Sequence, residues 1–159
     1  MIYLRYASDN LAPSYATLGS SAADLCAREA VALPAHGHAK VPTGVWIERV
    51  DWECVPEGLI PELQVRARSG LAAKKQVMLT NGVGTIDADY PGEICVLLTN
   101  LGSEPLHIEP GMRIAQLLMQ LVYRLPDLPV LQDARVGGFG STGVHSTSPS
   151  HRGDVAPGT

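Results

Sequence analysis

The residues best suited to chemistry lie in segment 80–92, which reads TNGVGTIDADYPG. Its Asn-Gly pair at 81–82 is a strong signal for a tight hairpin turn. If the residues that follow the hairpin are extended, Asp87 and Asp89 point to the same face of the chain, and Tyr90 comes directly after them. Two such carboxylates indicate a general base, a metal site or an ion pair, although aspartates that merely flank a turn would give the same pattern.

The glycine-rich segment 137–143, which reads GGFGSTG, is a second candidate. It contains the pattern G-x-G-x-x-G, but a dinucleotide-binding fold needs a helix and an acidic residue after that pattern, and a polar stretch follows here. The remaining alternatives are a flexible linker and a flap whose backbone N–H groups hold phosphate oxygens. In such a flap Phe139, the only phenylalanine of the chain, is suited to stack on a nucleobase.

Polar residues inside apolar or small-residue runs form a third group of candidates. Arg-Ala-Arg at 66–68 leads into a possible helix start at Ser69, where guanidinium and N–H groups together attract an anion. Asp24 interrupts one predicted strand, and Arg113 and Gln116 interrupt another. Taken singly, these patterns are also those of a surface arginine pair, a structural ion pair or an edge-strand residue.

The elements that position these residues are short runs that are apolar or alternate between apolar and polar residues, and turn signals separate them. Many short strands at such spacing predict an all-β barrel or sandwich. The predicted strands are Ile2–Tyr6, Ala22–Ala27, Val41–Ile47, Glu62–Arg66, Val77–Thr80, Glu93–Thr99, Leu106–Ile108 and Arg113–Leu121. One short helix is expected at Ser69–Lys75, with Ser69 as its cap.

The composition narrows the possible partners. With 159 residues, 45% of them hydrophobic and 18% charged, the chain has the size and make-up of one globular domain. Its net charge of −4 disfavours nucleic-acid binding, so an anionic ligand must be held by a few placed groups or a metal. Three widely spaced cysteines indicate neither a disulfide framework nor a zinc site. Without a membrane-spanning run or a secretory signal, we expect a soluble intracellular protein.

The C-terminal part of the sequence changes character. Segment 125–131 contains two prolines and is expected to be an extended connector, and the residues after 143 are rich in Ser, Pro, Gly and His. We therefore divide the chain into a β domain at 1–131, a glycine-rich arm at 132–143 and a disordered tail at 144–159.

Taken in order, these segments resemble the five motifs of the trimeric dUTPase family. The similarity runs from about Tyr15 to Gly143, and its most specific pieces are RSGLA at 68–72, GTIDADY at 84–90, RIAQ at 113–116 and GGFGSTG at 137–143. The resemblance implies a distorted β-barrel or jelly roll of the β-clip type with one short helix. It also implies a homotrimer with sites at the subunit interfaces, and a C-terminal arm that crosses to another subunit.

The resemblance further implies roles for individual residues. Asp87 would deprotonate the attacking water, and Tyr90 would lie under the deoxyribose. Asn81 and the hairpin backbone through Gly84, Thr85 and Ile86 would read uracil. The implied phosphate contacts are Arg68, Ser69, Gly70 and Gln116, and the implied lid residues are Arg135, Phe139, Gly140, Ser141 and Thr142. Asp24 would contact Mg²⁺ through water, with the ion held mainly by the substrate phosphates.

The implied activity is Mg²⁺-dependent hydrolysis of dUTP to dUMP and pyrophosphate by in-line attack of water on the α-phosphate. It would take place in the cytoplasm, supply dUMP for dTTP synthesis and keep uracil out of DNA. Two rival interpretations are a dCTP deaminase on a related fold and a nucleotide-binding regulator without turnover.

The sequence departs from the family pattern at three places. Arg135-Val136 precedes the glycines directly, which makes the arm one residue shorter than usual. SAADL at 21–25 lacks the glycine normally found in the first motif. Region 51–61 is longer than usual, and we interpret it as an enlarged surface loop.

Overall fold

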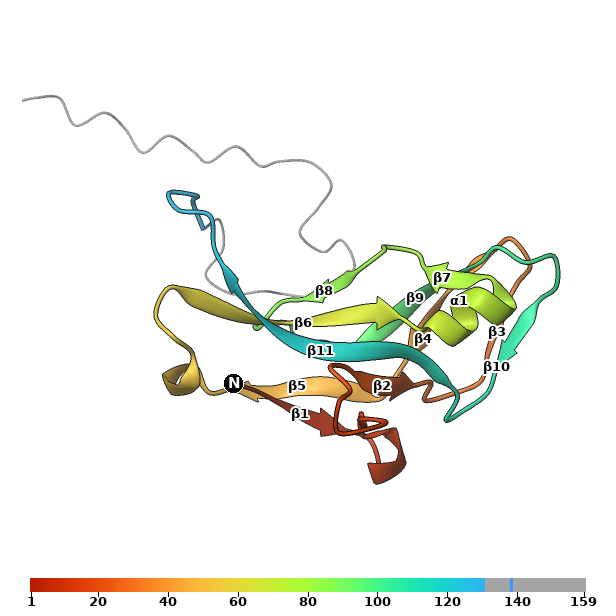
Figure 1. Ribbon diagram of the computed structural model, residues 1–159, viewed down its shortest axis with the longest axis horizontal. Helices are drawn as coiled ribbons and strands as arrows, with labels where there is room; N and C mark the ends of the chain where they lie inside the picture. The colour runs from red at the N-terminus through yellow and green to blue at the C-terminus, as the bar shows by residue number, and fades with distance from the viewer. Residues whose placement is uncertain (131–137, 139–159) are drawn as a thin grey trace, which may run out of the picture.

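The computed structural model describes residues 1–130 and Gly138, which fold mainly into β-strands (Figure 1). The strands are β1 Ile2–Tyr6, β2 Ala23–Cys26, β3 Val31–Leu33, β4 His38–Pro42, β5 Val45–Val50, β6 Leu59–Ala67, β7 Val77–Leu79, β8 Gly84–Ile86, β9 Cys95–Asn100, β10 Leu106–Ile108 and β11 Arg113–Tyr123. One α-helix, α1 (Ser69–Lys75), and two short 3-10 turns, Asp9–Leu11 and Trp52–Cys54, complete this part of the chain. The expectation of an all-β fold with one short helix is confirmed.

The strands form four antiparallel sheets with the orders β1-β5, β10-β3, β2-β11-β6-β8 and β4-β9-β7. In Figure 1, β6 and β11 run side by side along the molecule, with β8 beside β6 and α1 at one end. Among the described residues the sheets do not close into a continuous barrel. Strand β8 therefore ends its sheet and has one edge without a neighbouring strand there.

Alternation along the strands directs one set of side chains into a shared apolar core. In β9, Val96, Leu98 and Asn100 are buried, while the residues between them are partly exposed. Successive residues of a strand point to opposite faces, so this pattern places one face of β9 against the core. In β6, Leu63 and Val65 are buried in the same core.

The predicted strand at Val41–Ile47 is wrong as a single element. The chain breaks between β4 and β5 at Thr43 and Gly44, because Gly44 adopts a φ of +71°. A Cβ atom at Gly44 would lie 2.8 Å from Cδ1 of Leu11, so both the conformation and the packing require glycine. The Thr43 hydroxyl donates a 2.6 Å hydrogen bond to the carbonyl of Ile94, which fixes this turn against the start of β9.

Helix α1 has the predicted bounds, but Ser69 is not its cap. Arg68 occupies the capping position with extended backbone angles, its side chain makes no capping hydrogen bond, and Ser69 is the first helical residue. The helix ends at Lys75 and is followed by Gln76, which has left-handed backbone angles and whose N–H donates to the carbonyl of Ala72. At seven residues α1 is short, and none of the helices within residues 1–130 is long and apolar enough to cross a membrane.

Region 51–61 is tied to the start of the chain. The ammonium group of Met1 donates to the carbonyl of Asp51, and the N–H of Asp51 donates to the carbonyl of Met1 at 2.8 Å. The turn Trp52–Cys54 leaves both Trp52 and Cys54 exposed, and the Cys54 thiol lies 3.3 Å from the Asp51 carboxylate. The expected surface loop thus contains a short 3-10 turn, is joined to Met1 by backbone hydrogen bonds at Asp51, and gives way to β6 at Leu59.

Candidate active site

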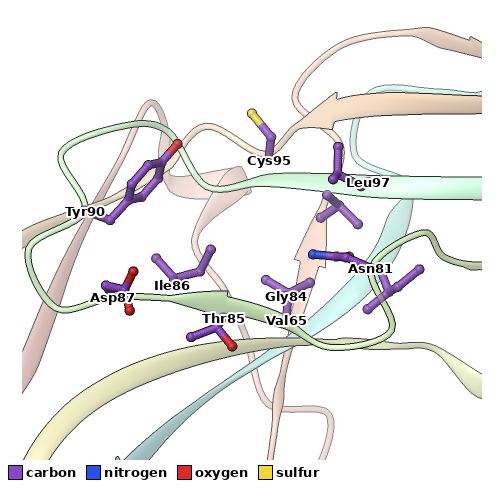
Figure 2. Close-up of a pocket in the computed structure, with 11 residues that line it drawn as sticks. Val65, Asn81, Gly84, Thr85, Ile86, Asp87, Tyr90, Cys95 and Leu97 are labelled. Carbon is purple, nitrogen blue, oxygen red and sulfur yellow. The ribbon is translucent and has the colours of Figure 1, made fainter. Parts of the chain in front are cut away.

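A pocket of about 270 Å³ lies between β8, β9 and the loop that joins them (Figure 2). Its walls are Val65, Leu79, Asn81, Gly84, Thr85, Ile86, Asp87, Tyr90, Cys95, Val96 and Leu97. The structure thus brings together the residues that the sequence assigned to base recognition, to the sugar platform and to water activation.

The hairpin that leads into β8 forms one wall of this pocket. It turns at Gly82, whose φ is +71° and whose N–H donates to the carbonyl of Leu79 at 3.2 Å. A Cβ atom at Gly84 would lie 3.2 Å from Cβ of Val65 and 3.4 Å from the Asn81 amide nitrogen. Glycine at this position therefore lets β8 approach β6 closely while Asn81 lies over the strand.

The chain turns sharply between Asp87 and Tyr90, so the condition under which Asp87 and Asp89 would share a strand face is not met. Strand β8 ends at Ile86, and the Tyr90 N–H donates to the Asp87 carbonyl at 3.0 Å, which closes a turn. Asp87 is exposed and lines the pocket, whereas Asp89 is exposed and does not line it. The two carboxylates are not a pair on one strand face.

Tyr90 is buried, with 9% of its surface exposed, and its ring is closely surrounded. Its hydroxyl donates to the carbonyl of Glu93 at 3.2 Å. A Cβ atom at Gly92 would lie 2.5 Å from that hydroxyl, and one at Gly138 would lie 2.4 Å from Cε2 of the ring. Burial, and then the neighbouring Cys95 and Glu93, raise the pKa of Tyr90, so the phenol stays protonated at neutral pH.

A second polar cluster surrounds Asp24, which is 6% exposed. Its Oδ1 accepts a hydrogen bond from Nε of Arg68 at 3.0 Å, and its Oδ2 accepts one from Nη1 of Arg113 at 3.1 Å. Arg68 also donates to the carbonyl of Arg113 at 3.1 Å. Gln116 pairs with Asp24 across the β2–β11 register, and Ser69 begins α1 beside Arg68 with its surface exposed.

The two clusters lie apart along β6. Ile86, just before Asp87, pairs with Leu63, whereas Arg68 follows Ala67 at the other end of the strand. Leu63 and Ala67 are separated by roughly 13 Å at about 3.3 Å per residue, and Asp87 and Arg68 lie beyond opposite ends of this stretch. Within one chain, the predicted general base and the predicted phosphate contacts do not meet.

The predicted lid residues Arg135, Phe139, Gly140, Ser141 and Thr142 lie outside the described residues. Their assignments stay predictions. Gly138, the one described residue of that glycine-rich segment, lies against the ring of Tyr90.

Cys95 is a pocket residue that the sequence analysis did not single out, as are Val65, Leu79, Val96 and Leu97. The buried set Ile94, Val96 and Leu98 shows the two-residue period that puts Cys95 on the other face of the strand. Burial is the main cause that raises its pKa, followed by the nearby carboxylate of Glu93. The thiol is therefore a neutral wall of the pocket at physiological pH.

Comparison with known proteins gives consistent results. A family model described as dUTPase matches residues 10–147. The deoxyuridine 5′-triphosphate nucleotidohydrolase of Chlamydia trachomatis serovar L2 is 40% identical over 148 residues, which cover 89% of this chain and 97% of that protein.

Solved structures agree with the fold. A dUTPase from Streptococcus mutans matches with a TM-score of 0.65 and 28% identity, covering 79% of this chain and 98% of that one. A mutant dUTPase of Staphylococcus aureus phage phi11, in which a structural Mg(II) ion is coordinated, matches with a TM-score of 0.64, and the match covers 83% of this chain and 97% of that one. At 20% identity the phage protein supports the fold alone.

The raised pKa of the Cys95 thiol predicts a loss of stability at alkaline pH. Folding favours the protonated thiol, so this contribution is complete below the ordinary thiol value of 9.0 and is lost as the pH rises through the higher folded-state value. We expect the urea midpoint to fall less between about pH 8 and about pH 10.5 in Cys95→Ser than in the unmodified protein. Cys54→Ser, at an exposed thiol, is the matched control. An equal pH-dependent loss in Cys95→Ser and the unmodified protein would contradict this account.

Proposed function

This chain belongs to the dUTPase family and is a dUTP diphosphatase, and we propose that it cleaves dUTP to dUMP and pyrophosphate by Mg²⁺-dependent in-line attack of water on the α-phosphate. Such a reaction supplies dUMP and limits uracil incorporation into DNA. The observation that carries the proposal is that the hairpin, Asp87 and Tyr90 line one pocket.

The free edge of β8 supports uracil recognition by the backbone. On its other side β8 pairs with β6 from Val65 to Leu63, and among the described strands it has no second neighbour. An edge strand presents N–H and C=O groups at fixed spacing, which match the donor and acceptor pattern of a uracil ring. Asn81 at the base of the hairpin adds an amide to this edge. A tight backbone also leaves little room for the 5-methyl group of thymine.

Tyr90 is suited to lie under the deoxyribose. Its ring lines the pocket, its hydroxyl is fixed on the Glu93 carbonyl, and Gly92 and Gly138 lie close around it. A flat ring held in this way leaves no space for a 2′-hydroxyl. Since its pKa is raised, Tyr90 supplies shape at neutral pH and does not act as a base.

Asp87 is the general base in this proposal. It lines the pocket with an exposed carboxylate, on the loop that also carries Tyr90. Such a carboxylate accepts the proton of an attacking water, a role that contributes about 10²–10⁴-fold to a rate.

The residues present are compatible with an Mg²⁺ ion that the substrate phosphates hold. Mg²⁺ keeps several waters and needs only one or two carboxylates nearby, and residues 1–130 contain no group of three acidic, His or Cys side chains that would form a cage. The bound ion would neutralise part of the triphosphate charge. Asp24 would reach it through water in our assignment, although both of its carboxylate oxygens already accept hydrogen bonds from arginines.

We also propose that the protein is a homotrimer with its sites between subunits. The separation of Asp87 from Arg68 along β6 supports a shared site, in which a second copy brings its Arg68 cluster, with Ser69, Gly70 and Gln116, to the phosphates. The segment after β11 supports contact with a neighbour, since Leu125, Leu128 and Val130 are between 61% and 74% exposed. Exposed apolar side chains of this kind are suited to pack against another subunit.

A substrate panel tests the function directly. The protein is incubated with dUTP, UTP, dTTP and dCTP, with and without Mg²⁺, and the products are separated. We expect conversion of dUTP alone to dUMP and pyrophosphate, and only with Mg²⁺. Uracil nucleotides formed from dCTP would indicate a deaminase instead, and bound dUTP without turnover would indicate a regulator.

Replacing the general base should remove turnover and leave binding. We expect Asp87→Asn to lower kcat by about 10²–10⁴-fold while dUTP affinity changes little, because the amide cannot accept the proton. Asp89→Asn is the matched control, since Asp89 is a nearby exposed carboxylate that does not line the pocket. Steady-state rates and calorimetric binding measure both effects. Wild-type turnover in Asp87→Asn would overturn the mechanism.

Mixed assemblies test whether the site is shared between copies. Asp87→Asn and Arg68→Gln are each expected to be inactive alone, and co-refolding them in equal amounts should restore about a quarter of the wild-type rate by random assortment. Arg113 still pairs with Asp24 in Arg68→Gln, so the fold is expected to survive. If one copy supplied both residues, the mixture would stay inactive. Light scattering of the same samples gives the number of subunits.

A further inference from the structure

Glu93 lies in the loop between β8 and β9 that also carries Asp87 and Tyr90, and its side chain is largely buried. It is 17% exposed, and its two carboxylate oxygens each have a donor. Nη1 of Arg28 donates to Oε2 at 3.0 Å, and the N–H of Gly44 donates to Oε1 at 2.6 Å. A carboxylate that loses water must be paired in this way, and the pairing fixes its position.

The backbone around Glu93 is fixed to the same partners. The N–H of Ile94 donates to the carbonyl of Val45 at 2.8 Å, and the carbonyl of Ile94 accepts the hydroxyl of Thr43 at 2.6 Å. Residues 93–94 are therefore fastened to the β4–β5 turn through both side-chain and backbone hydrogen bonds.

The backbone of Arg28 and of Gly44 is itself fixed in a position that allows both residues to contact Glu93. The N–H of Arg28 donates to the carbonyl of Pro42 at 2.9 Å. Gly44 adopts a φ of +71°, and a Cβ atom there would lie 3.3 Å from Cδ of Arg28. Glycine thus lets the Gly44 amide and the guanidinium reach Glu93 together.

Glu93 also contacts the substrate platform directly. Its carbonyl accepts the hydroxyl of Tyr90 at 3.2 Å, and the Tyr90 N–H closes the turn with Asp87 at 3.0 Å. The position of the ring in the pocket therefore depends on the position of residue 93.

We propose that Glu93, clamped by Arg28 and the Gly44 amide, is a positioning residue that sets the Tyr90 ring against the sugar and so determines discrimination between dUTP and UTP. This inference rests on the proposed function. Loosening the clamp lets the ring shift, which opens space for the 2′-hydroxyl while uracil recognition and the Asp87 carboxylate remain. Small displacements of a positioning group have large kinetic effects.

The test compares Glu93→Ala, Glu93→Gln and Arg28→Ala with the unmodified protein. We expect the ratio of kcat/KM for dUTP over UTP to fall about tenfold in Glu93→Ala and Arg28→Ala, mainly through a lower KM for UTP, because the space that opens accommodates its 2′-hydroxyl. Glu93→Gln still accepts the Gly44 N–H but presents no charge to Arg28, so a smaller fall is expected. Glu29→Ala is the matched control, because Glu29 is the exposed second partner of Arg28 and is expected to leave the ratio unchanged.

A second readout separates this inference from the proposed function. Calorimetry with dUMP and UMP measures sugar discrimination without turnover, and thermal unfolding shows which variants remain folded. Folded Glu93→Gln and Arg28→Ala with wild-type discrimination in both assays would overturn the positioning role. An unmodified protein that neither hydrolyses dUTP nor prefers dUMP to UMP would overturn the proposed function, and the inference with it.

Discussion

Strand β6 is the constraint on which the rest of the site depends. It pairs with β11 along its whole length on one edge and with β8 on the other, and its buried face contributes Leu63 and Val65 to the core. A register slip of one residue would turn that face to solvent and bury Glu62 and Arg66. Because the core fixes the register, it also fixes where the hairpin and the arginine cluster lie along the strand.

In this acidic chain, arginine side chains pair with the two most buried of the carboxylates that form ion pairs. Asp24 lies between Arg68 and Arg113, and Glu93 lies between Arg28 and a backbone N–H. A buried charge without compensation is costly, and each of these carboxylates has two donors, so that losing one arginine still leaves a second donor in place. In the proposed mechanism, the triphosphate is neutralised by exposed parts of the same guanidinium groups, by backbone donors and by a metal.

Local signals predicted the elements that local interactions determine. The bounds of β1, α1 and β10 agree with the sequence analysis, whereas β3 and β8 were not among the predicted strands. The break at Gly44 depends on packing against Leu11 and Arg28, and the turn at Asp87 is closed by a hydrogen bond from Tyr90. The strand pattern of the sequence shows neither contact. The pocket residues of the hairpin were predicted from the sequence. The Arg28–Glu93 contact joins residues 65 positions apart, so no short sequence pattern predicts it.

In the proposed site, the groups that discriminate between nucleotides differ from the groups that carry out hydrolysis. The elements that would recognise base and sugar are the hairpin edge and the ring of Tyr90, and packing in the protein interior holds them in place. The groups that would handle charge, Asp87 and the arginine cluster, are exposed or partly exposed and lie at opposite ends of β6. In the proposed mechanism, selectivity therefore follows from the fold of one chain, whereas turnover depends on a second chain that brings the charged groups together around one substrate.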